Sequence, residues 1–483
     1  MSHSNSMELF REAPVPKAVF QNALPAMAAM LMVLVYNLAD TFFIGQTHDA
    51  FQVAAVSLAT PVFLIFMAVG TIFGIGGTSV ISRATGQGKP EYAKKVCAFC
   101  MWGCIITGVV MSAFMLVFMD SILGLVGASP DTWSLAKTYL TIVVYSGPFA
   151  LISNCYSNII RAEGQSGKAM MGQVLGNLCN IILDPVMILG FGWNIAGAAI
   201  ATVIGNLAAS LYYFFYFLRG KSSLSIHPKD ATFKEGICKN VLAIGIPAAL
   251  GPVLMSISQI IVNSQMSGYG DMAIAAMGVA AKVTTITGMV CMGLGQGVQP
   301  LLGYCVGAKL WGRFQEILKL SLLLAFGLSA VLTGICYLFA DQIVSVFLTD
   351  PTAFDYAVQF SKILLATSFL FGVFYVLTNA LQAMGAAAES LVISISRQGV
   401  IFIPTLFILK AAIGMTGIVW AQPVADVLSL LLAYILYTRI SKKMVSGKGL
   451  LHPKKTGKIA LPYLIKERRG ETSCWKKYQQ KQS

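Results

Sequence analysis

Charged side chains are scarce in this sequence. Only 11% of its 483 residues are Asp, Glu, Lys or Arg, whereas 56% are hydrophobic, and the mean hydropathy is +0.73. Soluble domains carry about 25% charged residues, so the composition excludes an ordinary soluble protein. Apolar runs of about 20 residues, the length that crosses a bilayer core as a helix, recur along the whole chain.

The usual signatures of catalysis and ATP use are also absent. The sequence contains no HExxH, no GxSxG and no P-loop, and its four His are scattered. Most of the ten Cys lie within apolar runs and are interpreted as small buried hydrophobes. We therefore expect a protein that is not an enzyme and holds no permanently bound cofactor.

The apolar runs predict an all-α integral membrane protein with twelve transmembrane helices. The expected spans are 18–45, 52–80, 93–119, 135–160, 167–191, 195–218, 240–267, 273–300, 315–340, 357–383, 390–411 and 414–438. The polar N-terminus lacks the layout of a cleavable signal, and the first span is longer than a signal h-region, so we expect this span to be retained.

Lys and Arg predict the orientation in the membrane. All but four of the 34, namely Lys137, Lys282, Lys362 and Lys410, are assigned to one side. Arg397 is counted on that basic side, as a loop residue. The positive-inside rule then places both termini in the cytoplasm. The net charge of +14 is concentrated at membrane ends and in the tail, which indicates contact with the lipid bilayer rather than nucleic acid.

The chain repeats itself. Leu24-Pro25 returns as Ile246-Pro247, "NIIRAEG" (158–164) as "NALQAMG" (379–385), and "IAGAAIA" (195–201) as "MTGIVWA" (415–421), displaced by 220 to 222 positions. Two six-helix lobes, related by a pseudo-twofold axis along the membrane normal, are predicted. The expected parts are a cytoplasmic N-terminus (1–17), an N-lobe (18–218), a cytoplasmic linker (219–239), a C-lobe (240–438) and a basic cytoplasmic tail (439–483).

Three aspartates lie inside the predicted spans: Asp40, Asp184 and Asp426. A carboxylate at the bilayer centre costs roughly 2.5–3.5 kcal/mol. The repeat places Ile261 or Val262 opposite Asp40, and Ile403 opposite Asp184. The second half therefore builds the same helices without these acids, which favours a functional role for them over a structural one.

Polar residues accompany these acids at helical spacing. Gln173, Asn177, Asn180 and Asp184 form one stripe, Tyr36 and Asn37 share a face with Asp40, and Thr202 and Asn206 form a third pair. Lipid penalises such faces, so they should meet inside the lobe. Pro185 cannot donate a hydrogen bond to the carbonyl of Ile181, and the freed oxygen beside two carboxylates suits a proton or Na⁺.

The sequence resembles the multidrug and toxic compound extrusion (MATE) transporters over about residues 15–440. The resemblance is carried by "ALPAM" and "LADTFFIG" within 23–45, "ISRATGQG" (81–88), "IIRAEGQ" (159–165), "NIILDP" (180–185) and "GLGQGVQPLLGYCVGA" (293–308). The acids of the first half are similar to the DinF-type branch, and the methionine-rich character to its MepA-like exporters.

The resemblance implies a secondary active exporter of lipophilic, mostly cationic drugs, driven by H⁺ or Na⁺ antiport through alternating access. It also implies that the coupling ion binds to Asp40, Asn180, Asp184 and Thr202. This ion is either a proton or the metal ion Na⁺. Tyr36, Asn154, Gln173 and Asn177 are expected to line the lobe or contact substrate. Asp426 is a candidate second protonatable site, with pairing to Gln422 as the alternative.

Two further expectations concern cargo and assembly. Related exporters move lipid-linked sugars or another amphipathic metabolite on the same fold. Their cavities need several basic residues for pyrophosphate, whereas only Lys282 and Lys362 are placed within spans here, so small organic cations are favoured. Lys282 is expected to extend toward the outer surface rather than to bind substrate. The protein is expected to be a monomer.

Overall fold

The computed structural model describes residues 9–445 except 48, 221 and 349. The described residues up to Arg439 form one compact unit, and a second unit begins at Ile440. The helices below belong to the first unit, apart from the end of α18. Every long element in the described residues is a helix, which confirms the predicted all-α class.

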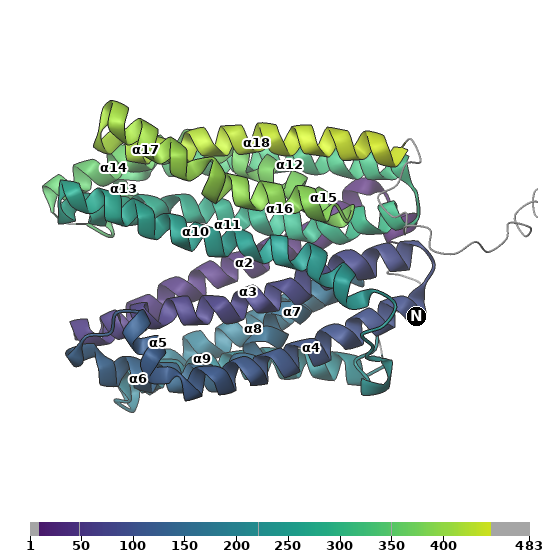
Figure 1. The fold of residues 1–483 in the computed structure, drawn as a ribbon, viewed down its shortest axis with the longest axis horizontal. Coiled ribbons are helices and arrows are strands. Elements are labelled where there is room, and N and C mark those ends of the chain that lie inside the picture. The colour runs from purple at the N-terminus through teal and green to yellow at the C-terminus, as the bar shows by residue number, and fades with distance from the viewer. Residues whose placement is uncertain (1–8, 48, 221, 349, 446–483) are drawn as a thin grey trace, which may run out of the picture. The chain divides into compact units, whose positions relative to one another are not determined.

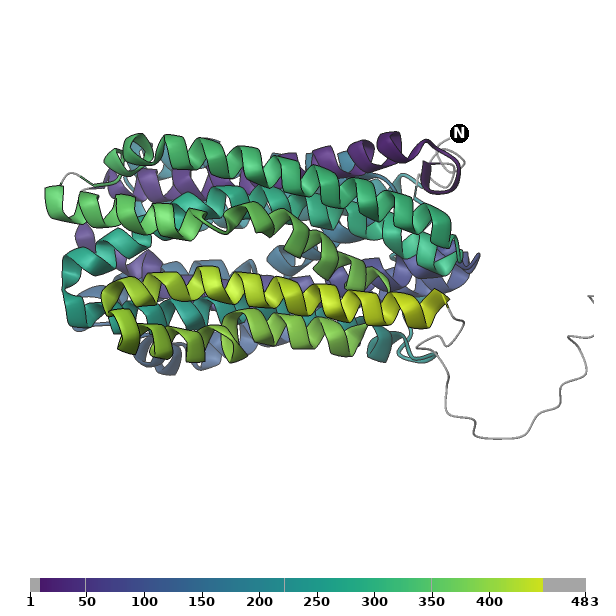
Figure 2. The ribbon, with the colours of Figure 1, turned by 90° about the horizontal axis from the view of Figure 1, so that it is seen from above.

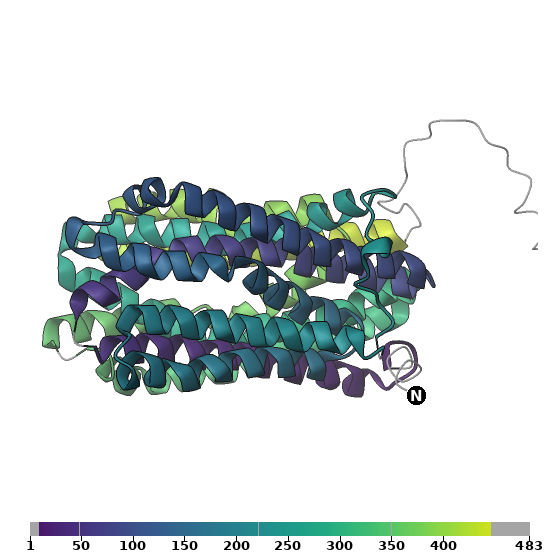
Figure 3. The same cartoon turned by 90° about the horizontal axis from the view of Figure 1, so that it is seen from below.

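The first half of the chain supplies eight α-helices. They are α2 (Val15–Gly45), α3 (Ala50–Gly86), α4 (Pro90–Val117), α5 (Met119–Leu125), α6 (Pro130–Tyr145), α7 (Gly147–Ala162), α8 (Ser166–Pro185) with the π-helix η1 (Val186–Gly190), and α9 (Asn194–Leu218). Figure 3 views the bundle from the side on which these helices lie. Helices α6 and α7 are one bent span, with a turn of 54° at the break between them.

The second half, seen in front in Figure 2, repeats this order. It contains α10 (Ile237–Met266), α11 (Asp271–Gly307), α12 (Trp311–Leu338), α13 (Ala340–Ser345), α14 (Pro351–Leu365) with α15 (Phe371–Ala383), α16 (Ala387–Ile395) with the π-helix η5 (Ser396–Val400) and α17 (Phe402–Ile413), and α18 (Met415–Val445). Eleven described helices are long and apolar enough to span a membrane, and the bent pair makes twelve, as predicted.

The two halves pack through four long helices. Helix α3 lies against α10, and α2 lies against α11, so each half sends its first helix to the second helix of the other (Figure 1). The interface is confined to one end of the bundle, which we call the basic end because loops 87–89, 163–165, 219–236 and 308–310 lie there. Residues 73–82 and 293–305 are buried at every position. Along the rest of α3 and α11, buried residues are interspersed with more exposed ones.

Glycines allow the backbones of the two halves to meet at the basic end. A Cβ atom on Gly86 would lie 2.2 Å from the carbonyl oxygen of Tyr304, and one on Gly307 would lie 2.1 Å from that of Arg83. These two contacts are related by the same displacement of 221 positions, since 86 + 221 = 307 and 83 + 221 = 304. The internal repeat therefore produces two equivalent contacts, related by a pseudo-twofold axis, in which no side chain separates the helices.

Polar contacts add to this closed interface. The buried guanidinium of Arg161 on α7 donates from one nitrogen to Gln296 on α11 at 3.0 Å and to Asn158 at 3.1 Å. Ser79 on α3 donates to the carbonyl oxygen of Gln382 at 2.5 Å. The basic end is thus held shut by hydrogen bonds as well as by backbone packing.

Two sequence interpretations of single residues can be compared with these positions. Lys282 lies with its ammonium 5.4 Å from the centre of the Phe347 ring, near the end opposite the basic end, as expected for a side chain that extends outward. Cys97 and Cys100 have CxxC spacing, but both are fully buried in α4. No group of three or more His, Cys, Asp or Glu within the described residues is arranged to hold a metal ion.

Candidate functional site

Two carboxylates meet inside the first half. Asp184, in the last turn of α8, is fully buried, and Asp40, near the end of α2, is half-buried. Their charges interact with each other. In the described part of the chain the five ion pairs involve neither of them. Two buried negative charges without a basic partner are strongly disfavoured, so this pair needs a proton or a cation.

Asn180 and Thr202 lie beside Asp184 and contribute neutral oxygens. Asn180 precedes Asp184 by one helical turn on α8, and Thr202 lies against Asn180 from the third turn of α9. All three side chains are at most 6% exposed. The predicted quartet of Asp40, Asn180, Asp184 and Thr202 is therefore gathered within one half, on three helices.

The amide of Asn180 lies between Asp184 and Thr202. The orientation that satisfies both neighbours has its nitrogen donating to Asp184 Oδ2 at 2.9 Å and its oxygen accepting from Thr202 Oγ1 at 3.3 Å and from the backbone N–H of Thr202 at 3.1 Å. Asn180 thus connects the buried carboxylate on α8 to α9.

Two tyrosines flank the site. Tyr36, one turn before Asp40, interacts with both carboxylates and with the Thr202 side chain. Tyr139 on α6 has the same partners and is 8% exposed. The sequence analysis identified Tyr36 and missed Tyr139. A comparison of the two halves would have identified Tyr139. The displacement of 221 positions places Phe360, which has no hydroxyl group, opposite this tyrosine.

The other predicted lining residues divide into two groups. Gln173 and Asn177 are half-buried on α8, and each has a buried polar atom, Oε1 and Nδ2, without a hydrogen-bond partner in the described residues. One carboxylate oxygen of Asp40 and one of Asp184 are also buried without a hydrogen-bond partner in the described residues. Such atoms usually indicate water, an ion or a ligand. These four residues are therefore the best-supported lining of the first half.

Asn154, which was also expected to line the lobe or contact substrate, forms hydrogen bonds to a neighbouring helix. Its amide nitrogen donates to the carbonyl oxygen of Met67 at 2.7 Å and to Thr71 Oγ1 at 3.1 Å. Both partners lie on α3, so this side chain ties α7 to α3. No described contact connects it to the two carboxylates.

Pro185 lies where α8 changes its hydrogen-bonding pattern. The α-helix ends at this residue and the π-helix η1 follows directly. Because proline has no N–H to donate, the regular ladder is interrupted here. The predicted local disturbance of the helix next to Asp184 is thus present.

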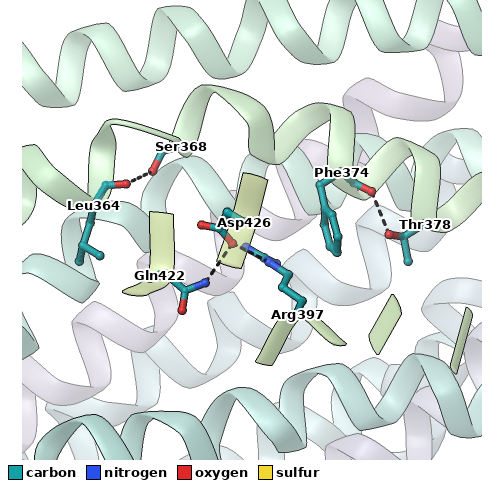
Figure 4. Close-up of polar contacts among 7 residues, drawn as sticks. All are labelled: Leu364, Ser368, Phe374, Thr378, Arg397, Gln422 and Asp426. Carbon is teal, nitrogen blue, oxygen red and sulfur yellow. Dashed lines mark hydrogen bonds and ion pairs between the residues drawn. The ribbon is translucent and has the colours of Figure 1, made fainter. Parts of the chain in front are cut away.

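The second half has a different buried charge. Arg397 donates from Nε to Asp426 Oδ1 at 2.9 Å, and Gln422 donates to the same oxygen at 2.9 Å (Figure 4). The predicted pairing of Asp426 with Gln422 is confirmed, and Arg397 is an additional partner. Arg397 was placed on the basic side as a loop residue, which is wrong, because it lies inside the span Ala387–Ile413. A partner 29 positions away on the next helix explains how a guanidinium is accommodated there.

Comparison with known proteins agrees with the fold and the repeat. The multidrug export protein MepA of Staphylococcus aureus (strain NCTC 8325 / PS 47) is 32% identical over 436 residues, covering 89% of this chain and 96% of that protein. A crystal structure of MATE in complex with MaL6 has a TM-score of 0.87 at 24% identity, over 91% of this chain and 99% of that chain. A structure described as the outward-facing conformation of a multidrug resistance MATE family transporter of the MOP superfamily gives 0.87 at 23% identity, with the same coverage.

The family model MatE matches this chain twice, at residues 25–186 and 247–408. The two matches are displaced by 222 positions, since 25 + 222 = 247, and together they span most of both halves. They confirm the internal repeat and the resemblance drawn from the motifs. The chain belongs to the MatE family.

Proposed function

We propose that this protein is a secondary active exporter of lipophilic, mostly cationic compounds, driven by H⁺ or Na⁺ antiport through alternating access. The observation that carries the proposal is the pair of carboxylates in one half, the buried Asp184 and the half-buried Asp40, which have no described basic partner. The name of the relatives, multidrug export protein, supports the class of cargo. The protein acts in a bacterial cytoplasmic membrane with its basic end in the cytoplasm.

The chemistry of the site explains how ion and cargo exchange. With both carboxylates ionised, the first half attracts an organic cation, because opposite charges interact strongly away from water. A proton or Na⁺ that neutralises the pair removes this attraction. Asn180 connects α8 to α9 beside this site. The exchange of ions therefore takes place at a contact between two helices.

The closed basic end sets the direction of access. The continuously buried part of the interface between the halves lies at that end, so the proposal places access to the first-half site on the opposite side. Asp184 lies 18 residues beyond Ser166, roughly 27 Å along α8 from the basic end. Cargo therefore leaves from this arrangement, and uptake from the cytoplasm requires the interface at Gly86 and Gly307 to separate.

Transport driven by one gradient at a time tests the proposal. Purified full-length protein in liposomes should accumulate a fluorescent organic cation when an opposing H⁺ or Na⁺ gradient is imposed. Accumulation should collapse with an uncoupler in the first case, or with a Na⁺ ionophore in the second. Transport that depends on neither gradient would rule out antiport. Transport of lipid-linked sugars, without transport of the organic cation, would favour the alternative cargo.

Thr202→Val should separate the two ions, because valine keeps the shape of threonine and removes one neutral oxygen. Na⁺ loses a ligand, and we expect the Na⁺ concentration for half-maximal transport to rise by about tenfold, the lower end of the effects seen when metal sites are disturbed. Transport driven by H⁺ alone should change little, since a proton needs no coordination shell. Thr202→Ser, which retains the hydroxyl, is the matched control. Equal losses with both gradients would contradict a role for Thr202 as a Na⁺ ligand.

A further inference from the structure

The ion pair of the second half occupies the counterpart of the first-half site. The repeat aligns 195–201 with 415–421, so Gln422 corresponds to Thr202. It aligns Pro404 with Pro185, so η5 corresponds to residues 177–181, the turn that carries Asn180. Arg397 thus lies on the span that corresponds to α8, and Gln422 and Asp426 lie on the span that corresponds to α9, within a few positions of the counterparts of Asn180 and Thr202.

The guanidinium of Arg397 is held from several sides. Its central carbon lies 5.1, 4.5 and 5.7 Å from the ring centres of Phe371, Phe374 and Tyr375. Aromatic faces attract cations, and a carboxylate opposite them completes the surroundings of a bound cation. The side chains of Arg397 and Asp426 are 12% and 4% exposed. In the described residues Asp426 has no other charged partner, and Tyr375 is the one further titratable group that interacts with Arg397.

The pair leaves one carboxylate oxygen unused. Asp426 Oδ1 accepts both hydrogen bonds, and the buried Oδ2 has no partner in the described residues (Figure 4). Charge is balanced even so, because one guanidinium faces one carboxylate. The first-half site differs in having two carboxylates that form no ion pair in the described residues. The two halves therefore meet the same electrostatic requirement in different ways, one with a side chain and one with an ion from solution.

We propose that Arg397 is the resident cation of the second half, fixed where the first half takes up an exchangeable ion, so that only the first half carries coupling ions. This inference rests on the proposed antiport. It makes Arg397 a positioning residue that sets how many ions accompany each cargo molecule. Without it, Asp426 becomes a second buried acid that must take up a proton or Na⁺.

A double-mutant cycle on purified full-length protein tests this assignment. At pH 8 without Na⁺, Arg397→Gln should lower the thermal unfolding midpoint, because it leaves Asp426 buried and unpaired. Adding Asp426→Asn should restore most of the loss. Lowering the pH to 5.5, or adding Na⁺, should raise the midpoint of the single variant relative to wild type, since the stranded carboxylate then binds a cation. The double variant should show no such gain.

Arg397→Lys is the control that keeps the charge and should behave like wild type in its response to pH and Na⁺. If Arg397→Gln cannot be purified, the cycle can start from the other partner. Asp426→Asn leaves the guanidinium of Arg397 buried and unpaired, and adding Arg397→Gln should raise the unfolding midpoint of the Asp426→Asn variant. Absence of restoration in either direction, or equal responses of the single and double variants to pH, would overturn the proposal.

Transport separates this inference from the proposed function. The double variant should export the fluorescent cation with the wild-type ion stoichiometry, because both halves are again neutral without an added ion. A folded double variant with a changed stoichiometry, or with no transport, would show that Arg397 does more than neutralise Asp426. Wild-type transport that ignores both gradients would instead refute antiport, while the stability cycle would still report on the pair.

Discussion

Asp184→Asn should reduce gradient-driven export to the background of liposomes without protein. Asparagine has nearly the same shape as aspartate, but it can neither carry a negative charge nor release a proton. The variant thus loses the attraction for an organic cation and the exchange that drives its release. Asp40→Asn should have the same effect, because the two carboxylates act as one pair. Export of ethidium from cells and uptake in liposomes measure the loss.

The protein should remain in the membrane at its normal level, since neutralising a buried, unpaired acid does not disturb packing. Asp120→Asn is a suitable control, because Asp120 forms an exposed ion pair with Lys137 at 2.7 Å, away from the site. It should transport normally. Export at the wild-type rate by the Asp40→Asn, Asp184→Asn double variant would refute the assignment of the ion site.

Gly86→Val should prevent the basic end from closing. The new Cβ would lie 2.2 Å from the backbone oxygen of Tyr304, and a backbone cannot turn away as a flexible side chain can. Overpacking of this kind costs about 1–3 kcal/mol or more, and about 1.4 kcal/mol shifts an equilibrium tenfold. The population closed at the basic end should fall by one to two orders of magnitude, and export should fall with it.

Native Cys305 reports this change directly. It lies in the uninterrupted buried stretch of α11 and is fully buried. A maleimide should therefore label it faster in Gly86→Val than in wild type, as measured by mass spectrometry of its peptide. Gly327→Val is the matched control, because no atom lies within 4 Å of a Cβ at that helical position. Unchanged labelling and transport in Gly86→Val would show that this contact does not close the interface.

Much of the candidate site was predictable because the two halves of the chain can be compared with each other. Asp40 and Asp184 stood out where the second half has apolar residues, and helical spacing placed Asn180 one turn from Asp184. Thr202 came from helical spacing and from the resemblance, and it lies against Asn180. The same comparison applied to hydroxyl groups would have found Tyr139. The orientation of Asn154 was beyond any sequence pattern, because its partners are backbone and side-chain atoms of a helix 83 to 87 positions earlier.

Arg397 was misplaced for a physical reason. A single arginine in an apolar run is ordinarily assigned to the membrane surface, because an unpaired charge within the bilayer is expensive. Its neutralising partner, Asp426, is on the next span, and the aromatic rings beside it come from the preceding one. Neither is visible as a local pattern. The acid itself was noticed, but its sequence neighbour Gln422 was the only partner that helical spacing offered.

The glycine contacts between Gly86, Gly307 and the opposing backbones have a consequence for the entropy of the proposed transport cycle. Ordinary interfaces immobilise rotamer-rich side chains, at up to about 2 kcal/mol each. Where main chain meets main chain there are almost no rotamers to freeze on joining, and none to regain on parting. Under the proposed alternating access, these two contacts would open and close with little change in side-chain entropy.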